Sequence, residues 1–370
     1  MFKITQRYLA TGFIPPFVAS VLFFVSFLLT FQLFKIIRIV IGRGVEFITV
    51  LELIGHIAIS FLPFAIPVSG LFAASYIMSR LSEDSEIIAM RSFGIAKWRL
   101  YLPFLLLSLL IGVTIYALNQ RIIPYSKREF KNSVIRLSSK GLVANIHPGK
   151  FFTDIPGITL FATKSTGIGK QMKDVFITVN QGGATKKTIL ARQGRLIKKE
   201  GSKSTQGSIS LYLQDGNIVE QQGDELNITK ILFQEYEFPI SSSNYQTTSI
   251  TKDSMRASDQ LLRIIQQDDS KDGKGAVKTR LEYWSRVNTP FLTIIFIWLG
   301  FSLGIKRGRG RGRSTGPITF SLLVLYYLFF FLFISMARKG TMPATYAIFT
   351  PTLLLSFAAG WFYHKLDWPS

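Results

Sequence analysis

The chain has 370 residues, of which 48% are hydrophobic, and it carries a formal net charge of +21 at neutral pH. The apolar residues, 32 Phe among them, form several long uncharged runs, which exclude a single water-soluble domain and indicate a membrane protein. A charge of +21 would suit nucleic acid, but the basic residues flank the apolar runs or lie in one long insert, so we expect no nucleic-acid partner. The sequence has no Cys, which excludes disulfides and thiolate chemistry.

Six runs of at least 19 residues contain no Asp, Glu, Lys or Arg. About 20 apolar residues span the hydrocarbon layer as a helix, so each run predicts one transmembrane helix. The first run is too long for a signal peptide and has no small-residue cleavage site, so we expect it to be retained. The predicted spans are Tyr8–Phe34, Leu53–Ser79, Leu100–Gln120, Val287–Ile305, Ser314–Ala337 and Gly340–His364.

Basic residues in the short loops set the predicted orientation, because cytoplasmic loops carry an excess of Lys and Arg. With both termini in the cytoplasm, the outer connections hold five basic residues, Lys35, Arg38, Arg43, Arg338 and Lys339. Large domains translocate largely regardless of charge, so the insert between the third and fourth spans then lies outside, in the periplasm of an organism with two membranes. The inner side holds twelve, namely Lys3, Arg7, Arg80, Arg91, Lys97, Arg99, Lys306, Arg307, Arg309, Arg311, Arg313 and Lys365.

The long insert reads as mostly β. Short stretches rich in β-branched and aromatic residues alternate with turn signals such as Gly182-Gly183, Gly201, Asp215-Gly216 and Gly223. This spacing favours a β-sandwich or jelly-roll sheet over βαβ units, and a short helix is expected near Ala257–Gln267. The predicted strands are Gly157–Thr163, Asp174–Asn180, Thr188–Arg192, Ser208–Leu213 and Ile228–Phe233.

The predicted fold is therefore a polytopic α-helical membrane protein with six transmembrane helices and an inserted periplasmic all-β domain of jelly-roll type. We expect transmembrane helices 1–3 over residues 1–123, the β domain over 124–280 and helices 4–6 over 281–370. A coupling helix at about 82–94 belongs to the first part.

Motifs for catalysis and metal binding are absent from the sequence. It contains no GxxxxGK[ST], and Gly167-Ile168-Gly169-Lys170 reads as a turn between strands. There is no HExxH, and His56, His147 and His364 are too far apart to suggest a metal site. No acidic or basic residue lies in the middle of a span, where proton- and ion-coupled carriers usually keep such groups. We therefore expect no catalytic residue, metal or cofactor in this chain, and any energy for uphill transport to come from a partner.

The loop Ser79–Arg99 is the candidate point of entry for that energy. Ser82 as cap, acidic residues in the first turn and Gly94 at the end predict a short amphipathic helix on the cytoplasmic side. Such a helix either only links two spans or docks in a groove of an ATPase. Glu86 has no basic residue three or four positions away, which suits it to a basic partner in another protein. The apolar Ile87, Met90 and Phe93 would then fill the groove.

Several segments together resemble the LptF/LptG (YjgP/YjgQ) permease family over nearly the whole chain. The resemblance is carried by Arg80–Ile95, which matches the family's cytoplasmic loop with its Ser-Glu pair at Ser85-Glu86. Further segments match in the same order, and the layout of three spans, a β domain and three spans is also that of the family. These segments are Tyr8-Leu9, Phe151-Phe152, Gly157–Phe161, Leu211–Gly216, Ile231–Tyr236 and Glu282–Pro290.

The resemblance implies a membrane subunit of the ABC transporter that extracts lipopolysaccharide from the inner membrane. It implies a second homologous permease as heterodimer partner, two cytoplasmic ATPase subunits that bind ATP and Mg, and a periplasmic jelly-roll bridge protein that receives the lipid. The residues expected to couple to the ATPase are Glu86, Ile87, Met90, Arg91 and Phe93.

Lys35, Arg38 and Arg43 are the candidate lipid contacts. They lie near the outer end of the first span, and the first two are three residues apart, on one face of a helix. Long basic side chains there can reach the phosphates of lipopolysaccharide or anchor the helix to other membrane lipids. Their position opposes the positive-inside bias, which favours the first role.

Two other functions stay open at this point. The chain could be another ABC-type permease for lipids or lipoproteins, although such permeases place the large outer domain after the first span. It could instead be a membrane-anchored assembly protein that transports nothing and binds a partner through its β domain.

Overall fold

The computed structural model describes residues 2–40, 47–145, 149–153, 158–166, 171–180, 185–199, 208–222, 228–239, 253–267, 274–305 and 315–366. The chain forms two compact units. The membrane unit comprises Met1–Gln32, Gly55–Lys127 and Asp253–Ser370, and the second unit comprises Leu33–Ile54 and Arg128–Lys252. We describe each unit by itself.

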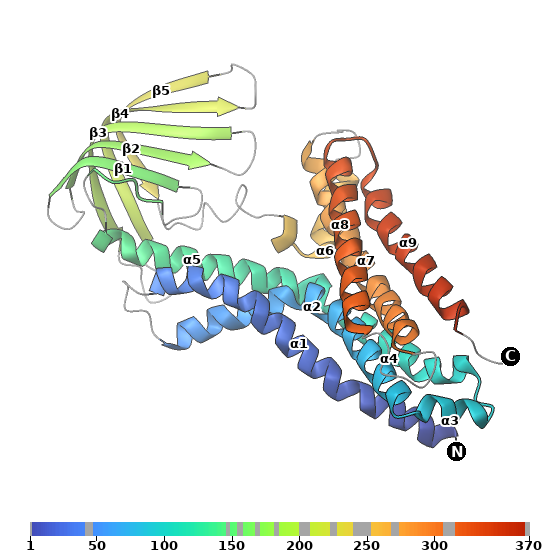
Figure 1. Ribbon diagram of the computed structural model, residues 1–370. Coiled ribbons are helices and arrows are strands. Elements are labelled where there is room, and N and C mark those ends of the chain that lie inside the picture. Colours follow the sequence, from blue (N-terminus) through green and yellow to red (C-terminus); the bar gives the residue numbers. More distant parts are fainter. Residues whose placement is uncertain are drawn as a thin grey trace. The chain divides into compact units, whose positions relative to one another are not determined.

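Six helices are long and apolar enough to cross a membrane, which confirms the predicted number (Figure 1). The fourth begins at Lys274, well before its predicted start at Val287, because the helix extends beyond its uncharged part. These helices are α1 (Phe2–Val40), α2 (Phe47–Glu83), α4 (Lys97–Ala117), α7 (Lys274–Gly304), α8 (Thr315–Arg338) and α9 (Ala344–His364).

The third span continues into the insert without a break. A π-helical turn, η1 (Leu118–Ile122), joins α4 to α5 (Ile123–Asn145). Helix α5 was not predicted from the sequence, because the insert was expected to be mostly β from its first residues. The insert returns through a 3₁₀ turn, η3 (Asp253–Met255), and α6 (Ser258–Gln267), which confirms the short helix expected near Ala257–Gln267.

Helix α7 is the centre of the membrane unit. It packs against α4, α8 and α9, and 61% of its most apolar window is buried inside the protein. It also crosses α2 closely, because a Cβ on Gly304 would lie 2.6 Å from Cβ of Met78 and one on Gly300 would meet the backbone oxygen of Leu71. Small residues at such positions let two membrane helices approach with their backbones in contact.

Polar side chains tie α7 to its neighbours within this apolar core. Asn288 Nδ2 donates to Thr352 Oγ1 of α9 at 2.9 Å, and the hydroxyl of Tyr326 on α8 lies 3.3 Å from the same oxygen. All three residues are buried. Hydrogen bonds of this kind fix the register of neighbouring helices where lipid offers no alternative partner.

A second polar cluster joins α7 to the segment that returns from the insert. Arg286 is 6% exposed, and its guanidinium donates to the backbone oxygens of Arg256 and Asp253 and to the carboxylate of Glu282. It also donates to Oγ of Ser258, at the start of α6. The returning chain is therefore held to α7 by one buried cation that donates to three of its acceptors.

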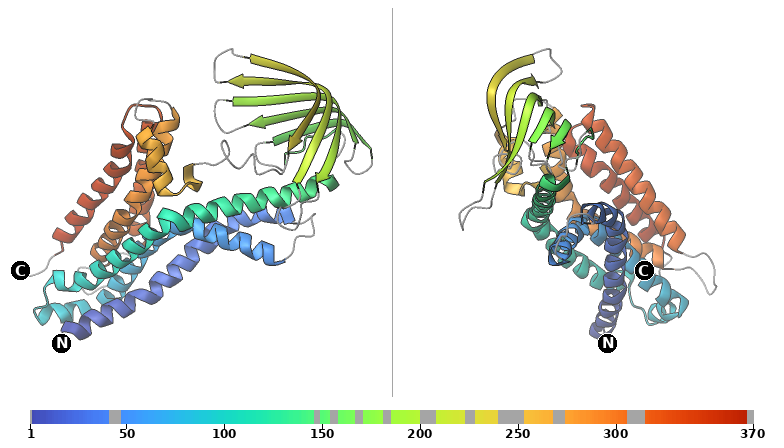
Figure 2. Two further views of the ribbon diagram at one scale, coloured as in Figure 1. Left: turned by 180° about the vertical axis from the view of Figure 1, so that it is seen from behind. Right: turned by 90° about the vertical axis from the view of Figure 1, so that its left-hand side faces the viewer.

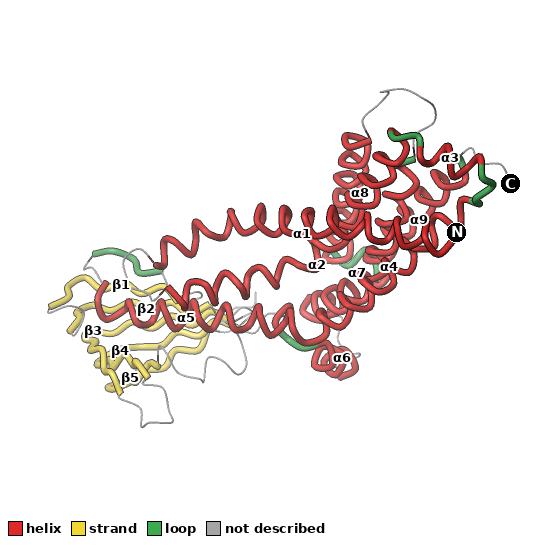
Figure 3. The backbone as a smooth tube through the Cα atoms, turned by 90° about the horizontal axis from the view of Figure 1, so that it is seen from below, coloured by secondary structure: helices red, strands yellow, loops and turns green. Residues whose placement is uncertain are grey.

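The insert forms one five-stranded antiparallel sheet in the order β1-β2-β3-β4-β5 (Figure 3). This confirms the predicted β domain between the third and fourth spans. One face carries a core of aliphatic side chains, such as Leu160, Ile177, Ile189 and Leu213. The strands are β1 (Ile158–Thr166), β2 (Gln171–Asn180), β3 (Thr185–Lys199), β4 (Ser208–Gln222) and β5 (Ile228–Pro239).

The strands are longer than predicted because they bend where the sequence suggested that they end. Asp215-Gly216, predicted as a turn, lies inside β4, and the predicted ends at Arg192 and Leu213 are therefore wrong. The predicted turns at Gly182-Gly183, Gly201 and Gly223 lie outside the described residues. The bend can be followed in Figure 2.

One row of residues across the sheet makes this bend, and we call it the crease. The ladder pairing skips each member of the row, and Asp174 and Asp215 adopt positive φ angles of 50° and 53°. Side chains along a strand normally alternate between the two faces of the sheet, and at the crease this alternation shifts by one residue. Leu213 before the crease and Ile218 after it are therefore buried in the same core. The crease consists of Thr163, Asp174, Arg192, Asp215 and Gln234.

Candidate coupling site

The short helix α3 (Glu86–Ser92) lies between the second and third spans. The sequence predicted it at about 82–94 with Ser82 as cap, and that start is wrong. Helix α2 continues to Glu83, its last turn closed by a hydrogen bond from Asp84 N to Arg80 O at 2.9 Å. Ser85 separates the two helices with a left-handed φ of 60° and makes no side-chain cap hydrogen bond.

The end of α3 is as predicted. Gly94 has a φ of +74°, which glycine adopts without strain. Gly94 N donates to Arg91 O at 2.9 Å, and Ile95 N donates to Met90 O at 3.2 Å. These bonds satisfy the last carbonyls of the helix and turn the chain toward α4.

The buried face of α3 packs against the membrane unit itself. Ile87 is 4% exposed and shares a cluster with Leu9 and Phe13 of α1, while Met90 packs against that cluster from its edge. The prediction that Ile87 fills a groove of an ATPase is therefore corrected. Its side chain already fills the chain's own core and sets the position of α3.

Several apolar side chains of this loop are exposed. Phe93 is 82% exposed and Ile88 is 42% exposed, and Trp98 at the start of α4 is 56% exposed. Arg91 is half-buried. Phe93 follows Glu86 by seven residues, about two helical turns, so both lie on one side of the helix, whereas Ile88 points away from them. The loop between the two spans thus exposes Glu86 and three apolar side chains, and we call these four residues the coupling surface.

The carboxylate of Glu86 has a partner that sequence reasoning missed. The hydroxyl of Tyr8, on the first turns of α1, donates to Glu86 Oε1 at 3.2 Å. The nearby Asp84 pairs with Arg80 of its own helix at 3.9 Å. Because 78 residues separate Tyr8 from Glu86, no local pattern indicates the pair. The one available signal was that the family resemblance matched both places.

The predicted lipid contacts are placed only in part. Lys35 and Arg38 lie in α1, three residues apart on one helix, and Arg43 lies outside the described residues. Because Lys35 and Arg38 are in the C-terminal part of α1 and Tyr8, the partner of Glu86, is in its first turns, the two predicted sites belong to opposite ends of one helix. The structure does not bring them together.

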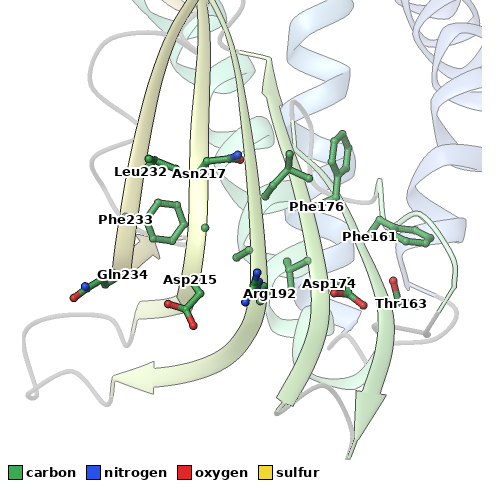
Figure 4. Close-up of a pocket in the computed structure, with 14 residues that line it drawn as sticks. Phe161, Thr163, Asp174, Phe176, Arg192, Asp215, Asn217, Leu232, Phe233 and Gln234 are labelled. Atoms are coloured by element: carbon green, nitrogen blue, oxygen red, sulfur yellow. The ribbon is translucent and has the colours of Figure 1, made fainter.

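A hollow of about 860 Å³ lies along the crease of the sheet (Figure 4). Its apolar lining includes Phe161, Phe176 and Leu190, which pair across three strands and alternate with the buried core residues. Among the residues that the structure describes, no three His, Asp or Glu side chains converge as metal ligands, in this hollow or elsewhere.

The family model described as "Lipopolysaccharide export system permease LptF/LptG" matches residues 7–365. This match includes all six spans, the sheet and α3. The chain belongs to the LptF/LptG permease family.

A curated relative of this LptF/LptG permease is an uncharacterized protein of Rickettsia prowazekii (strain Madrid E). The two are 18% identical over 254 residues, which cover 69% of this chain and 68% of the relative. Since that protein is uncharacterized, the functional information comes from the family. Membership makes the chain a membrane transport subunit of the lipopolysaccharide export system and excludes the non-transporting assembly protein.

Proposed function

We propose that the chain is the permease subunit of an ABC transporter that extracts lipopolysaccharide from the inner membrane. Two cytoplasmic ATPase subunits, which bind ATP and Mg, drive it, and a second permease of the same layout completes the membrane part. The observation that carries this proposal is the coupling surface, where an acidic residue and exposed apolar side chains stand between two membrane spans. The chain has no nucleotide-binding motif of its own, so the energy must come from a partner.

The proposed orientation places α3 on the side where ATP is found. Both termini lie in the cytoplasm and the sheet lies in the periplasm, in accord with twelve basic residues on the inner side against five on the outer side. Reporter fusions test this orientation. A periplasmic reporter inserted after Gly201 should be active and one inserted after Gly310 inactive, and the opposite result at either position would contradict it.

Glu86 is the proposed ionic contact with the ATPase. Its carboxylate accepts one hydrogen bond from Tyr8 and has further lone pairs for a basic residue of the partner. Phe93, exposed on the same side of the helix as Glu86, supplies apolar contact beside that ion pair. Arg91 is a further proposed contact, while Ile87 and Met90 pack against the first turns of α1 and hold the helix in place.

Substitution of Glu86 tests the proposal against a matched control. Truncating one partner of a shielded ion pair costs about 2–5 kcal/mol, whereas an exposed pair contributes about 0–1 kcal/mol. Glu86→Ala should therefore weaken ATPase association or separate ATP hydrolysis from lipid release, measured on the purified transporter in vesicles. Glu83→Ala, at the last residue of α2 and in the same loop region, should do much less. Equal and small effects of both substitutions would refute the role of Glu86.

The sheet is the proposed contact with the periplasmic jelly-roll bridge, which receives the lipid. A free strand edge can extend its sheet into that of another protein. Phe152 pairs with Leu160 and so covers part of the edge of β1, while β5 pairs only with β4 among the described strands. We therefore assign the bridge to the edge of β5. Photo-crosslinkers along Ile228–Phe233 should capture a β-rich periplasmic protein, and capture only along Ile158–Thr163 would reverse the assignment.

Lys35, Arg38 and Arg43 are the proposed contacts with the lipid phosphates. Reversing the charge of Lys35 and Arg38 together should reduce lipid release and lipid-stimulated ATP hydrolysis while assembly persists. Unchanged transport would leave them as anchors to ordinary membrane lipids.

A further inference from the structure

Helix α3 has little of its own to hold it in place. It has seven residues, and isolated helices this short are not stable in water. Ser85 precedes it in a left-handed conformation and contributes no side-chain hydrogen bond to its first turn. The position of α3 therefore depends on contacts with other parts of the chain.

Two of these contacts come from the same two turns of α1. Ile87 is buried against Leu9 and Phe13, and Glu86 accepts the hydrogen bond from Tyr8 at 3.2 Å. The apolar contact fixes how deep α3 lies, but it does not fix where the carboxylate points, because Glu86 is only half-buried. The hydroxyl of Tyr8 supplies that direction. Figure 1 shows the beginning of α1 beside α3.

We propose that Tyr8 is a positioning residue for energy transfer: its hydroxyl orients the Glu86 carboxylate toward the basic residue of the ATPase and makes α1 move together with α3. This inference rests on the proposed function, in which Glu86 is the ionic contact. One carboxylate oxygen accepts from Tyr8, and the other remains for the partner's cation. Since the first turns of α1 continue into the first membrane span, a shift of α3 would be passed to that span.

The first test removes only the hydroxyl. In the complete transporter, purified with its ATPase and reconstituted in vesicles, Tyr8→Phe should lower the lipid released per ATP hydrolysed by about two- to ten-fold, the range of one hydrogen bond. Basal ATP hydrolysis should persist, because the nucleotide site lies in the partner. Tyr76→Phe is the matched control, since Tyr76 is 56% exposed on α2 and makes no hydrogen bond to a described residue. It should leave the ratio unchanged.

The second test asks whether Tyr8 acts through Glu86. In a Glu86→Ala background, Tyr8→Phe should cause no further loss in the ratio. A spin label on a single cysteine at Ile88, in a chain that has no native Cys, reports on α3 directly. The label should become more mobile with Tyr8→Phe and should not change with Tyr76→Phe.

The outcomes separate this inference from the proposed function. If Glu86→Ala impairs coupling but Tyr8→Phe changes neither the ratio nor the label, the positioning role is wrong and the proposed function stands. If Tyr8→Phe causes an equal loss with and without Glu86, Tyr8 acts elsewhere and the inference is also overturned. If Glu86→Ala has no effect, the proposed function fails and the inference fails with it.

Discussion

Helices α7 and α1 lie in the same membrane unit, yet they are held in opposite ways. In the most apolar stretch of each helix, 61% of the residues of α7 are buried inside the protein and none of those of α1. Helix α7 contacts its neighbours through close backbone crossings and buried polar groups, whereas α1 contacts them through apolar side chains such as Leu9, Phe13 and Phe24. The comparison indicates a fixed scaffold around α7 and a peripheral α1 with a long apolar surface open to lipid or to another membrane protein.

This difference matters for coupling because α3 is attached to the peripheral helix. Ile87 and Glu86 both contact α1, while Ser82, in the last turn of α2, lies 3.5 Å from Gly304 O of α7. The loop between the second and third spans is therefore linked to both regions. Substitutions in the scaffold should reduce folding, and substitutions at α3 should reduce transport.

The largest expected effect is at the crossing of α7 and α2. Gly300→Ala would place a methyl group against the backbone of Leu71 and 3.0 Å from Cβ of Ala74. Overpacking in a core costs typically about 1–3 kcal/mol, and a clash with backbone lies at the upper end because it cannot be relieved by a rotamer change. We expect a large loss of folded protein on size-exclusion chromatography in detergent. Gly316→Ala on α8, where a Cβ meets nothing within 4 Å, should have no such effect.

The next effect concerns the polar cluster around Arg286. Arg286→Met should lower the stability of the membrane unit by about 1–3 kcal/mol, because two backbone oxygens lose their buried donor. The carboxylate of Glu282 is part-exposed and can bind water instead. Thermal unfolding in detergent measures this as a lower midpoint. Arg263→Met, at an exposed position of α6, is the control. A midpoint equal to that of the control would show that the cluster does not hold the returning chain.

The smallest effect concerns an ion pair on the sheet. Lys187 Nζ lies 2.9 Å from Glu220 Oε1. Burial lowers the pKa of Lys187, but hydrogen bonds and charge interactions with Glu220 and Tyr236 together outweigh it, so the pKa lies above its usual value. The stabilisation is therefore complete below the ordinary lysine pKa and is lost as the pH rises through the raised one. Glu220→Gln should cost about 0.2–1 kcal/mol at neutral pH. Thermal unfolding of the full chain should show the deficit at neutral pH and its disappearance at strongly alkaline pH, and a deficit that grows with pH would contradict the assignment.

The sequence predicted the number of spans and strands well, because both depend on local composition. An uncharged run of about 20 residues predicts a membrane helix without any knowledge of the helices that pack around it. Asp215-Gly216 was misread for the opposite reason. The dipeptide is a strong hairpin signal, but the strands on either side of β4 bend at the same level and keep the ladder intact around it.

The coupling site was predictable in its residue types and not in its contacts. Ser82 was predicted as the start of the helix, but the backbone hydrogen bonding of α2 continues past it and the helix begins at Glu86. Which of Ile87 and Ile88 is buried depends on where α1 passes, and the Tyr8–Glu86 bond joins two segments that are far apart in the chain. Such facts require the packed structure.

The central claim is that the open side of α3 docks on an ATPase, and photo-crosslinking at Phe93 tests it most directly. A photoreactive phenylalanine analogue at Phe93, 82% exposed, should capture the cytoplasmic ATPase in cells. The same analogue at Phe357 of α9, 75% exposed on an apolar helix surface, should not capture it. Capture at Phe93 alone would support the account, and absence of the ATPase from the Phe93 products, or equal capture at both positions, would contradict it.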